Sequence, residues 1–250
     1  MQINISFTSD RNILLPVHYN HILQGFIYKN ISEELAEFLH NKGYIFNGRS
    51  FKLFSYSRIL SRGKKENEKF NFGKRLSLVI SSPLDTFCKA IANSMLNNND
   101  LILGQNSVTV DQIQIYTNKV EKDEILVETL SPIVAYSTLL RPNGNKYTCY
   151  FMPGESDFER IISDNIIKKY KSFVKSYDEF ENGISIISIG KYKLNLIKYK
   201  DFIVKGASGM FLIKGDKRLL QMGLDTGFGG KNSQGFGCVN LLEGSEKHGI

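Results

Sequence analysis

Apolar and polar residues alternate with a period of two at the start of the chain, which predicts a strand over residues 2–8 (QINISFT). A helical pattern follows over residues 19–41. Asn30 and Ser32 are candidate helix caps inside this pattern. We therefore expect two helices, with the second restarting close to these caps and ending at Gly43.

The rest of the first half continues with strands and one more helix. FKLFSYS (51–57) and RLSLVIS (75–81) are typical of strands, and a basic loop joins them. Pro83 begins a helix, and residues 101–116 form a further strand or hairpin. The resulting order is β-α-β-β-α-β, which is the ferredoxin-like unit.

From about residue 122 the same order begins again, although no residue-level repeat relates the two halves. The predicted elements are strands at 125–137, 184–189, 191–199 and 202–215, helices at 155–175 and 216–222, and a last strand at 236–242. We predict an α+β protein with two tandem ferredoxin-like (RRM-like) domains, residues 1–120 and 121–250. The short polar link near residues 118–123 is expected to keep the halves close together.

Composition narrows the class of protein. The chain has 250 residues, 42% of them hydrophobic, and no apolar run of membrane-spanning length or signal-peptide pattern at its start, so we expect a soluble cytoplasmic protein. Cys88, Cys149 and Cys238 lie far apart without a CxxC pair. The cysteines therefore predict neither a zinc site nor a disulfide framework, and we expect no metal and no cofactor.

Positive charge is concentrated in two blocks. The net charge is +7, but residues 42–75 alone carry +8 and residues 190–237 carry +6, which leaves −7 for the rest of the chain. This distribution is typical of a protein that binds a phosphate backbone. Two solvated lysine-rich faces are the other interpretation, and charge alone leaves it open.

The second block contains the glycine-rich stretch GFGGKNSQGFG (227–237). It is not a Walker A loop, because Asn232 follows Lys231 and Asp225 stands where the leading glycine should be. A glycine-rich turn between helix and strand is one interpretation, and a cradle for the phosphate backbone of a nucleic acid is the sharper one. The predicted RNA-binding residues are Lys42, Arg49, Arg58, Gly227, Gly229, Gly230, Lys231, Asn232, Ser233, Gln234 and Gly235.

Four stretches, in order along the whole chain, resemble those of one known family. They are PVHYNHILQGFIY (16–28), LHNKGYIFNGRSFKLFSYS (39–57), LSPIVA (130–135) and the glycine-rich stretch. The chain is similar in these to the CRISPR-associated endoribonucleases that cut precursor CRISPR RNA within its repeats. The resemblance implies tandem ferredoxin-like domains, with repeat RNA as partner, possible contact with other CRISPR effector subunits, and a monomer or homodimer.

The resemblance also implies a reaction. It is a metal-independent attack of a ribose 2′-hydroxyl on the adjacent phosphate, which leaves a 2′,3′-cyclic phosphate and a 5′-hydroxyl. By matching position, Tyr28 acts as general base or orients the histidine, His40 as general acid, and Lys52 stabilises the transition state. Two alternatives stay open, in which His40 does both proton transfers or Lys42 supplies the cation.

The residues by themselves leave other interpretations open. A histidine at the carboxyl end of a helix, such as His40, is equally explained by the helix dipole. Lys52 lies on a predicted strand inside the basic block, where a solvated lysine is ordinary. The competing functions are an RNA-binding protein that does not cut and a structural subunit of a larger complex. The presence of His40 and Lys52 at the positions that the resemblance implies favours the enzyme over both alternatives.

Overall fold

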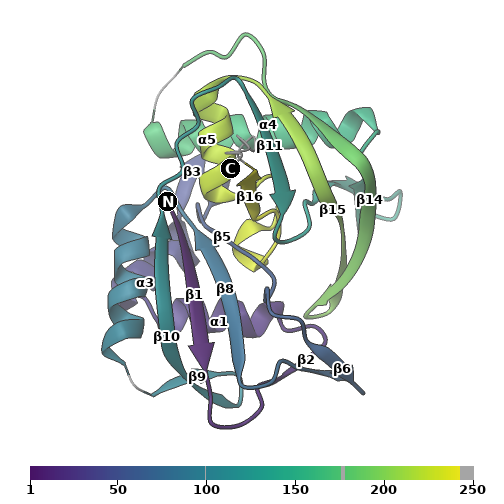
Figure 1. Ribbon diagram of the computed structural model, residues 1–250. Coiled ribbons are helices and arrows are strands. Elements are labelled where there is room, and N and C mark those ends of the chain that lie inside the picture. The colour runs from purple at the N-terminus through teal and green to yellow at the C-terminus, as the bar shows by residue number, and fades with distance from the viewer. Residues whose placement is uncertain (99, 176–177, 243–250) are drawn as a thin grey trace, which may run out of the picture.

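The computed structural model describes residues 1–98, 100–175 and 178–242 (Figure 1). The first half of the chain forms a five-stranded main sheet with two main helices, a small three-stranded sheet and a two-stranded sheet. Its elements are β1 (Gln2–Thr8), β2 (Leu14–Pro16), α1 (Asn20–Lys29), α2 (Glu33–Glu37), the π-helical turn η1 (Phe38–Lys42), β3 (Tyr44–Phe46), β4 (Arg49–Phe51), β5 (Ser55–Tyr56), β6 (Lys64–Glu66), β7 (Lys69–Asn71), β8 (Arg75–Ser81), α3 (Asp85–Asn97), β9 (Leu101–Leu103) and β10 (Asn106–Tyr116).

The second half forms a four-stranded main sheet and a separate two-stranded sheet. Its elements are β11 (Glu124–Thr129), β12 (Ala135–Leu140), β13 (Lys146–Phe151), α4 (Ser156–Val174), β14 (Ser185–Tyr199), β15 (Phe202–Lys214), α5 (Lys217–Thr226), the 3₁₀ turn η2 (Asn232–Gln234) and β16 (Val239–Leu242). The strand orders of the main sheets are β5-β8-β1-β10-β9 and β14-β15-β11-β16, and the small sheets are β2-β7-β6, β3-β4 and β12-β13. Both main sheets place the first core strand between the third and the fourth, which is the ferredoxin-like arrangement. The predicted fold class is therefore confirmed.

Each main sheet buries its own core. In β1, Ile3, Ile5 and Phe7 alternate inward and are at most 1% exposed, as the period of two predicts. They belong to a cluster that α1 and α3 complete from the helical side, for example with Phe26 and Phe87. A separate cluster lies between the second sheet and the helices α4 and α5. The predicted boundary at 120/121 falls in the segment between β10 and β11 and stays a proposal.

Most predicted elements are present with shifted ends, and several differ. The strand expected over 125–137 is two strands, β11 and β12, which belong to different sheets. The second helix is capped by Ser32, whose Oγ accepts from the Leu35 N–H at 3.3 Å, while Asn30 ends α1 and does not begin a capping box. Helix α3 begins at Asp85, two residues after Pro83. The strands expected at 184–189 and 191–199 are one strand, β14, with a register shift after Ile189.

The prediction of one strand over 51–57 is wrong. β4 ends at Phe51 and β5 begins at Ser55, and between them Leu53 has a φ of 52°. Leu53 and Phe54 are both buried, although neighbouring residues of a strand point to opposite sides. The chain turns here to bury two consecutive apolar side chains, so Lys52 lies on an irregular segment.

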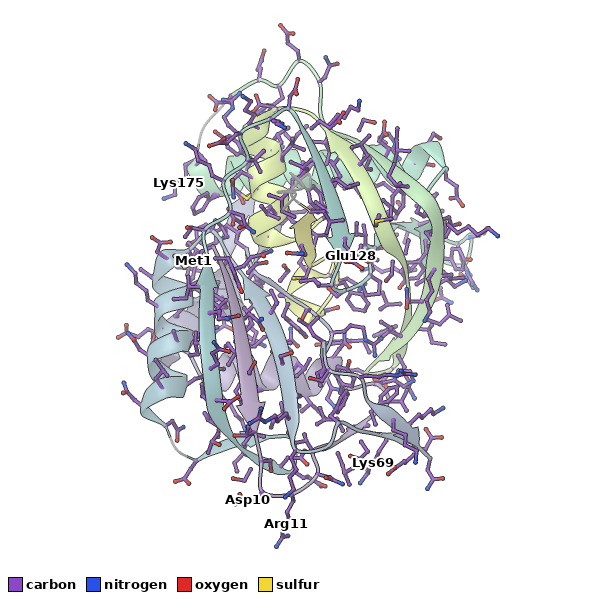
Figure 2. The ribbon with its side chains drawn as sticks, viewed as in Figure 1. Met1, Asp10, Arg11, Lys69, Glu128 and Lys175 are labelled. Carbon is purple, nitrogen blue, oxygen red and sulfur yellow. The ribbon has the colours of Figure 1, made fainter. Side chains whose placement is uncertain are left out.

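The first basic block does not form one surface. Lys64, Lys65 and Lys69 lie on the β6–β7 hairpin, which projects from the first domain; Figure 2 labels Lys69 at its lower right. Arg49 and Lys52 lie instead beside the second domain, in the pocket described below. Among the described residues, no helix is both long and apolar enough to cross a membrane.

Candidate functional site

The break between α1 and α2 brings Tyr28 and His40 together. Their ring centroids are 6.3 Å apart, and the rings meet edge to face at 83°. In a single straight helix these residues would lie about 18 Å apart along the axis. Asn30 donates from Nδ2 to the Phe26 carbonyl, which closes the end of α1, and the chain then folds back under the Ser32 cap.

His40 lies in the π-helical turn η1, and its side chain is exposed. Gly43 ends this turn with a φ of 66°, and its N–H donates to the Phe38 carbonyl at 2.7 Å. A Cβ at Gly43 would lie 2.5 Å from the Phe51 carbonyl oxygen. Glycine is therefore needed here so that the segment leading to Lys52 can pass close to the turn that carries His40.

Lys52 is held directly against this turn. Its Nζ donates to the His40 carbonyl oxygen at 3.0 Å and to the Ser50 Oγ at 3.3 Å. Ser50 in turn donates to the Lys42 carbonyl oxygen. An ammonium group has three donors, so one remains to approach an anion. The structure thus brings Tyr28, His40 and Lys52 together.

Burial changes the acid–base character of two of these residues. Burial, with a smaller contribution from nearby Tyr199, raises the pKa of Tyr28 to about 12. The Tyr28 phenol therefore stays protonated near neutral pH, which makes it a poor general base and a suitable positioning group. Partial burial lowers the pKa of Lys52 from its usual value, because the ammonium group loses hydration.

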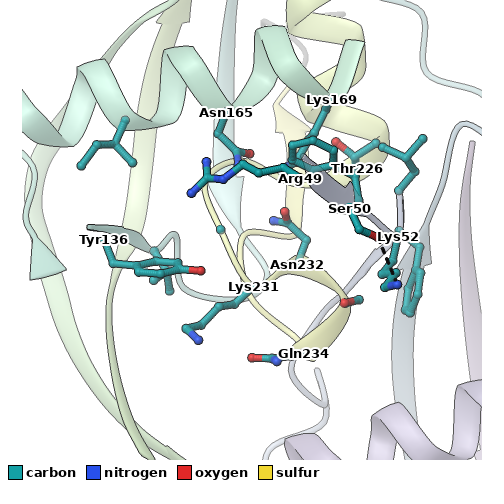
Figure 3. A pocket seen from close by; sticks show the side chains of 17 residues that line it. Arg49, Ser50, Lys52, Tyr136, Asn165, Lys169, Thr226, Lys231, Asn232 and Gln234 are labelled. Atoms are coloured by element: carbon teal, nitrogen blue, oxygen red, sulfur yellow. Dashed lines mark hydrogen bonds between the residues drawn. The ribbon is translucent and has the colours of Figure 1, made fainter. Parts of the chain in front are cut away.

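A pocket of about 280 Å³ lies between the two domains next to Lys52. The segment 49–54, the helix α4 and the glycine-rich stretch form its walls (Figure 3). Its polar and charged lining residues are Arg49, Ser50, Lys52, Tyr136, Asn165, Lys169, Thr226, Lys231, Asn232, Ser233 and Gln234. In the described part of the chain, no three His, Cys, Asp or Glu side chains are placed to hold a metal ion.

The glycine-rich stretch is clamped by the first domain. Asn20 donates from Nδ2 to the carbonyls of Gln234 at 3.0 Å and Gly235 at 3.2 Å, and Gln24 donates to the carbonyl of Ser233 at 2.6 Å. Asn20 and Gln24 are four residues apart and lie on one face of α1. The first and the last of the four resembling stretches therefore meet at the domain interface.

The other two stretches complete the same interface. Tyr56 donates from its hydroxyl to the Asn20 carbonyl at 2.8 Å, and Ser131 donates to the Tyr56 carbonyl at 3.0 Å. The Cys238 N–H, just beyond the glycine-rich stretch, donates to Ser131 Oγ at 3.0 Å. These buried hydrogen bonds fix the domains relative to each other.

The glycines of the stretch face the protein. A Cβ at Gly227 would meet Asn232, one at Gly229 would meet the Val134 carbonyl, and one at Gly235 would meet Tyr56. The N–H groups of Phe228, Gly230 and Gly237 donate to protein carbonyls. Much of the backbone is thus used inside the protein, and Lys231, Ser233 and Gln234 provide its partly exposed side.

The predicted RNA-binding residues separate into two groups. Arg49, Gly230, Lys231, Asn232, Ser233 and Gln234 line the pocket. Of the others, Gly227, Gly229 and Gly235 are buried in the stretch, Lys42 is exposed beside His40, and Arg58 packs over the Tyr19 ring with its guanidinium 5.2 Å from the centroid. Their contact with RNA stays a prediction.

Lys169 is a site residue that the sequence analysis missed. It is 3% exposed, and its Nζ donates to the carbonyls of Gly227 at 2.6 Å and Gly229 at 3.3 Å. Burial lowers the pKa of Lys169 to about 7. Its position in the helical pattern could have identified it, because Lys169 follows Ile162 and Ile166 on the buried face of α4.

This lysine makes stability depend on pH. From pH 7 to pH 8.5 the unfolded chain keeps the Lys169 proton while the folded protein loses it, so the free energy of unfolding should rise with pH by up to about 1.4 kcal/mol per unit. Lys169→Met should remove this rise, and Lys168→Met on the same helix should keep it. Urea unfolding across this range measures both, and equal slopes in wild type and Lys169→Met would contradict the assignment.

Comparison with known proteins gives consistent matches. Family models for CRISPR-associated protein Cas6 match residues 14–114 (N-terminal model) and 114–241 (C-terminal model). A CRISPR-associated endoribonuclease Cas6 of Methanocaldococcus jannaschii is 28% identical over 97% of this chain and 93% of its own length. One from Pyrococcus furiosus is 29% identical over 93% of this chain and 85% of its own length.

The fold is also that of a solved structure. The product of a Cas6-related gene from Pyrococcus furiosus superposes with a TM-score of 0.82 at 24% identity, and the match covers 97% of this chain and 98% of the other. At this identity the similarity supports the fold alone. It agrees with the tandem ferredoxin-like arrangement described above.

Proposed function

The chain belongs to the Cas6 family of CRISPR-associated proteins, and from this premise we propose that the site around His40 is where it cuts RNA. The protein is an endoribonuclease that binds CRISPR repeat RNA and cleaves the precursor within its repeats. One observation carries the placement of the active site. Tyr28 and His40 meet beside Lys52, and Lys52 lines a pocket whose other walls include the glycine-rich stretch.

The reaction is an attack of a ribose 2′-hydroxyl on the adjacent phosphate. The oxygen–phosphorus bond to the 5′-oxygen breaks, which leaves a 2′,3′-cyclic phosphate and a 5′-hydroxyl. His40 takes up the proton of the 2′-hydroxyl and delivers a proton to the leaving 5′-oxygen, because its imidazole is exposed and histidine is the side chain that most often transfers protons in enzymes. Lys52 directs its remaining donor toward the charge on the phosphorane. Tyr28 positions the His40 ring.

The RNA strand runs from this site along the basic side of the pocket. Lys231 and Arg49 neutralise its phosphates, and the clamped stretch holds Lys231 in place, with its Nζ 4.9 Å from the centroid of the Tyr136 ring. We also propose that the protein works in the cytoplasm.

Lys231→Met should weaken repeat-RNA binding and lower the slope of log affinity against log salt by about 0.7 to 1, as expected for one lost phosphate contact. The measurement is a filter-binding titration at several salt concentrations. Lys89→Met removes one exposed charge from α3 and should keep the wild-type slope. A wild-type slope for Lys231→Met would mean that this lysine contacts no phosphate.

The proposed activity is tested by incubating an RNA with two repeats in the presence of EDTA. One cut in each repeat is expected, and the upstream product should resist phosphatase until acid opens its cyclic phosphate. An RNA-binding subunit without activity would bind the same RNA and leave it intact. Cutting that depends on added metal would contradict the proposed reaction.

A further inference from the structure

Lys169 extends from α4 to the glycine-rich stretch and holds two of its carbonyl groups. Its Nζ donates to the Gly227 carbonyl at 2.6 Å and to the Gly229 carbonyl at 3.3 Å. Among residues 1–98, 100–175 and 178–242, no carboxylate forms an ion pair with this ammonium group. Burying a charge without an opposite charge beside it costs free energy. The presence of a lysine here therefore indicates that the stretch needs these two hydrogen bonds.

The two held carbonyls lie at a bend of the stretch. Gly227 and Gly229 have φ values of 82° and 74°, which glycine adopts readily and other residues rarely do. Because a peptide group is planar, a carbonyl that is held in one direction fixes the orientation of its whole peptide group. Lys169 thus fixes two peptide groups of the bend, and the second of them lies two residues before Lys231.

Lys231 depends on this support, because its own backbone conformation is unfavourable. Its φ and ψ are 61° and 28°, in the left-handed region that a residue with a Cβ rarely adopts. Such a conformation persists only where the surrounding structure holds it. The Lys231 side chain lines the pocket, with its Nζ 4.9 Å from the centroid of the Tyr136 ring (Figure 3).

Only one of these two lysines can contact RNA. Lys231 is partly exposed, so a phosphate in the pocket can approach it. The Lys169 side chain is 3% exposed, and two donors of its ammonium group are used by the stretch. An effect of Lys169 on RNA binding must therefore pass through the residues that it holds.

We propose that Lys169 is a positioning residue for RNA binding, which places Lys231 against a phosphate by holding the Gly227 and Gly229 carbonyls. The inference rests on the proposed contact between Lys231 and RNA, and it adds the group that orients that contact. Helix α4 thereby takes part in RNA binding without touching the strand.

The test is a double-mutant cycle of Lys169→Met and Lys231→Met, with affinity for repeat RNA measured by filter binding at several salt concentrations. Lys169→Met alone should weaken binding by about threefold to tenfold and lower the salt slope, although this lysine touches no phosphate. In Lys231→Met protein the same substitution should change neither quantity, because the contact that it supports is already lost. The single-turnover rate with all RNA bound should stay close to the wild-type value.

The controls separate position, charge and folding. Lys168→Met removes the neighbouring charge on α4 and should keep the wild-type affinity and slope. Lys169→Arg keeps a charged donor group at the buried position and should recover most of the affinity. If Lys169→Met does not fold, Lys169→Gln removes the charge with less change in polarity and enters the same cycle.

Two results would overturn the inference alone. One is wild-type affinity and slope after removal of the Lys169 charge, which would leave Lys169 a purely structural residue. The other is an equal loss from Lys169→Met in wild type and in Lys231→Met protein, because the charge would then act on RNA independently of Lys231. In both cases a defect of Lys231→Met upholds the proposed RNA contact. Wild-type binding by Lys231→Met would overturn that contact and the inference with it.

Discussion

His40→Ala is expected to lower the single-turnover rate of repeat cleavage by about 10²- to 10⁴-fold, the usual contribution of a positioned proton-transfer group. The affinity for repeat RNA should stay close to the wild-type value. The His40 ring is exposed, so its removal opens no cavity in the core. Nearby Lys52 stays in place, since it is bonded to the backbone carbonyl of His40 and not to its side chain.

The control for this variant is His21→Ala, which removes another exposed histidine, on α1. It should cut at the wild-type rate. Both rates are measured with excess enzyme on end-labelled RNA, with binding followed in parallel. Wild-type cutting by His40→Ala would place the active site elsewhere, and loss of binding together with cutting would indicate a role in holding RNA.

Gly237→Ala is expected to destabilise the protein by about 3–5 kcal/mol, among the largest effects of a single substitution. Gly237 has a φ of 73°, a conformation that other residues rarely adopt. A Cβ at this position would clash with the Phe228 carbonyl oxygen and lie 2.7 Å from Asn232 Nδ2. Both atoms belong to the glycine-rich stretch, one to its backbone and the other to the Asn232 side chain, so neither can move aside without a cost in free energy.

Gly144→Ala separates the two causes of this effect. Gly144 has a similar φ of 78°, but nothing lies within 4 Å of its Cβ position. It should therefore lose only the backbone term, about 1–2 kcal/mol. Urea unfolding measures both variants. Equal losses in the free energy of unfolding would mean that the glycine-rich stretch can rearrange to accommodate a side chain.

Much of the fold was predictable because its core strands and helices carry a clear period. The alternation of Ile3, Ile5 and Phe7 is an example. The β12–β13 hairpin was not predicted, since its strands are mostly exposed or half-exposed on both sides and carry no alternation. The turn at Leu53 was not predicted either, because its neighbours favour strands and tertiary burial of Phe54 decides the conformation.

The site was predictable in part. The cap signals around Ser32 allowed Tyr28 and His40 to meet, and the structure brings them together. The close contacts that require glycine in this stretch could not be predicted, because the residues that the glycines face come from segments distant in the sequence. Lys169 reaches the Gly227 carbonyl across 58 residues, and Asn20 reaches Gln234 across 214. The partners of such polar groups follow from tertiary structure and not from local pattern.

The most direct test of the proposed active chemistry is cleavage, in EDTA, of repeat RNA with a single 2′-deoxy substitution moved along the repeat. If a ribose 2′-hydroxyl attacks the adjacent phosphate, only the substitution immediately 5′ of the cleaved phosphate should abolish cutting, and that RNA should still bind. Cutting of that RNA at the wild-type rate would contradict the proposed reaction.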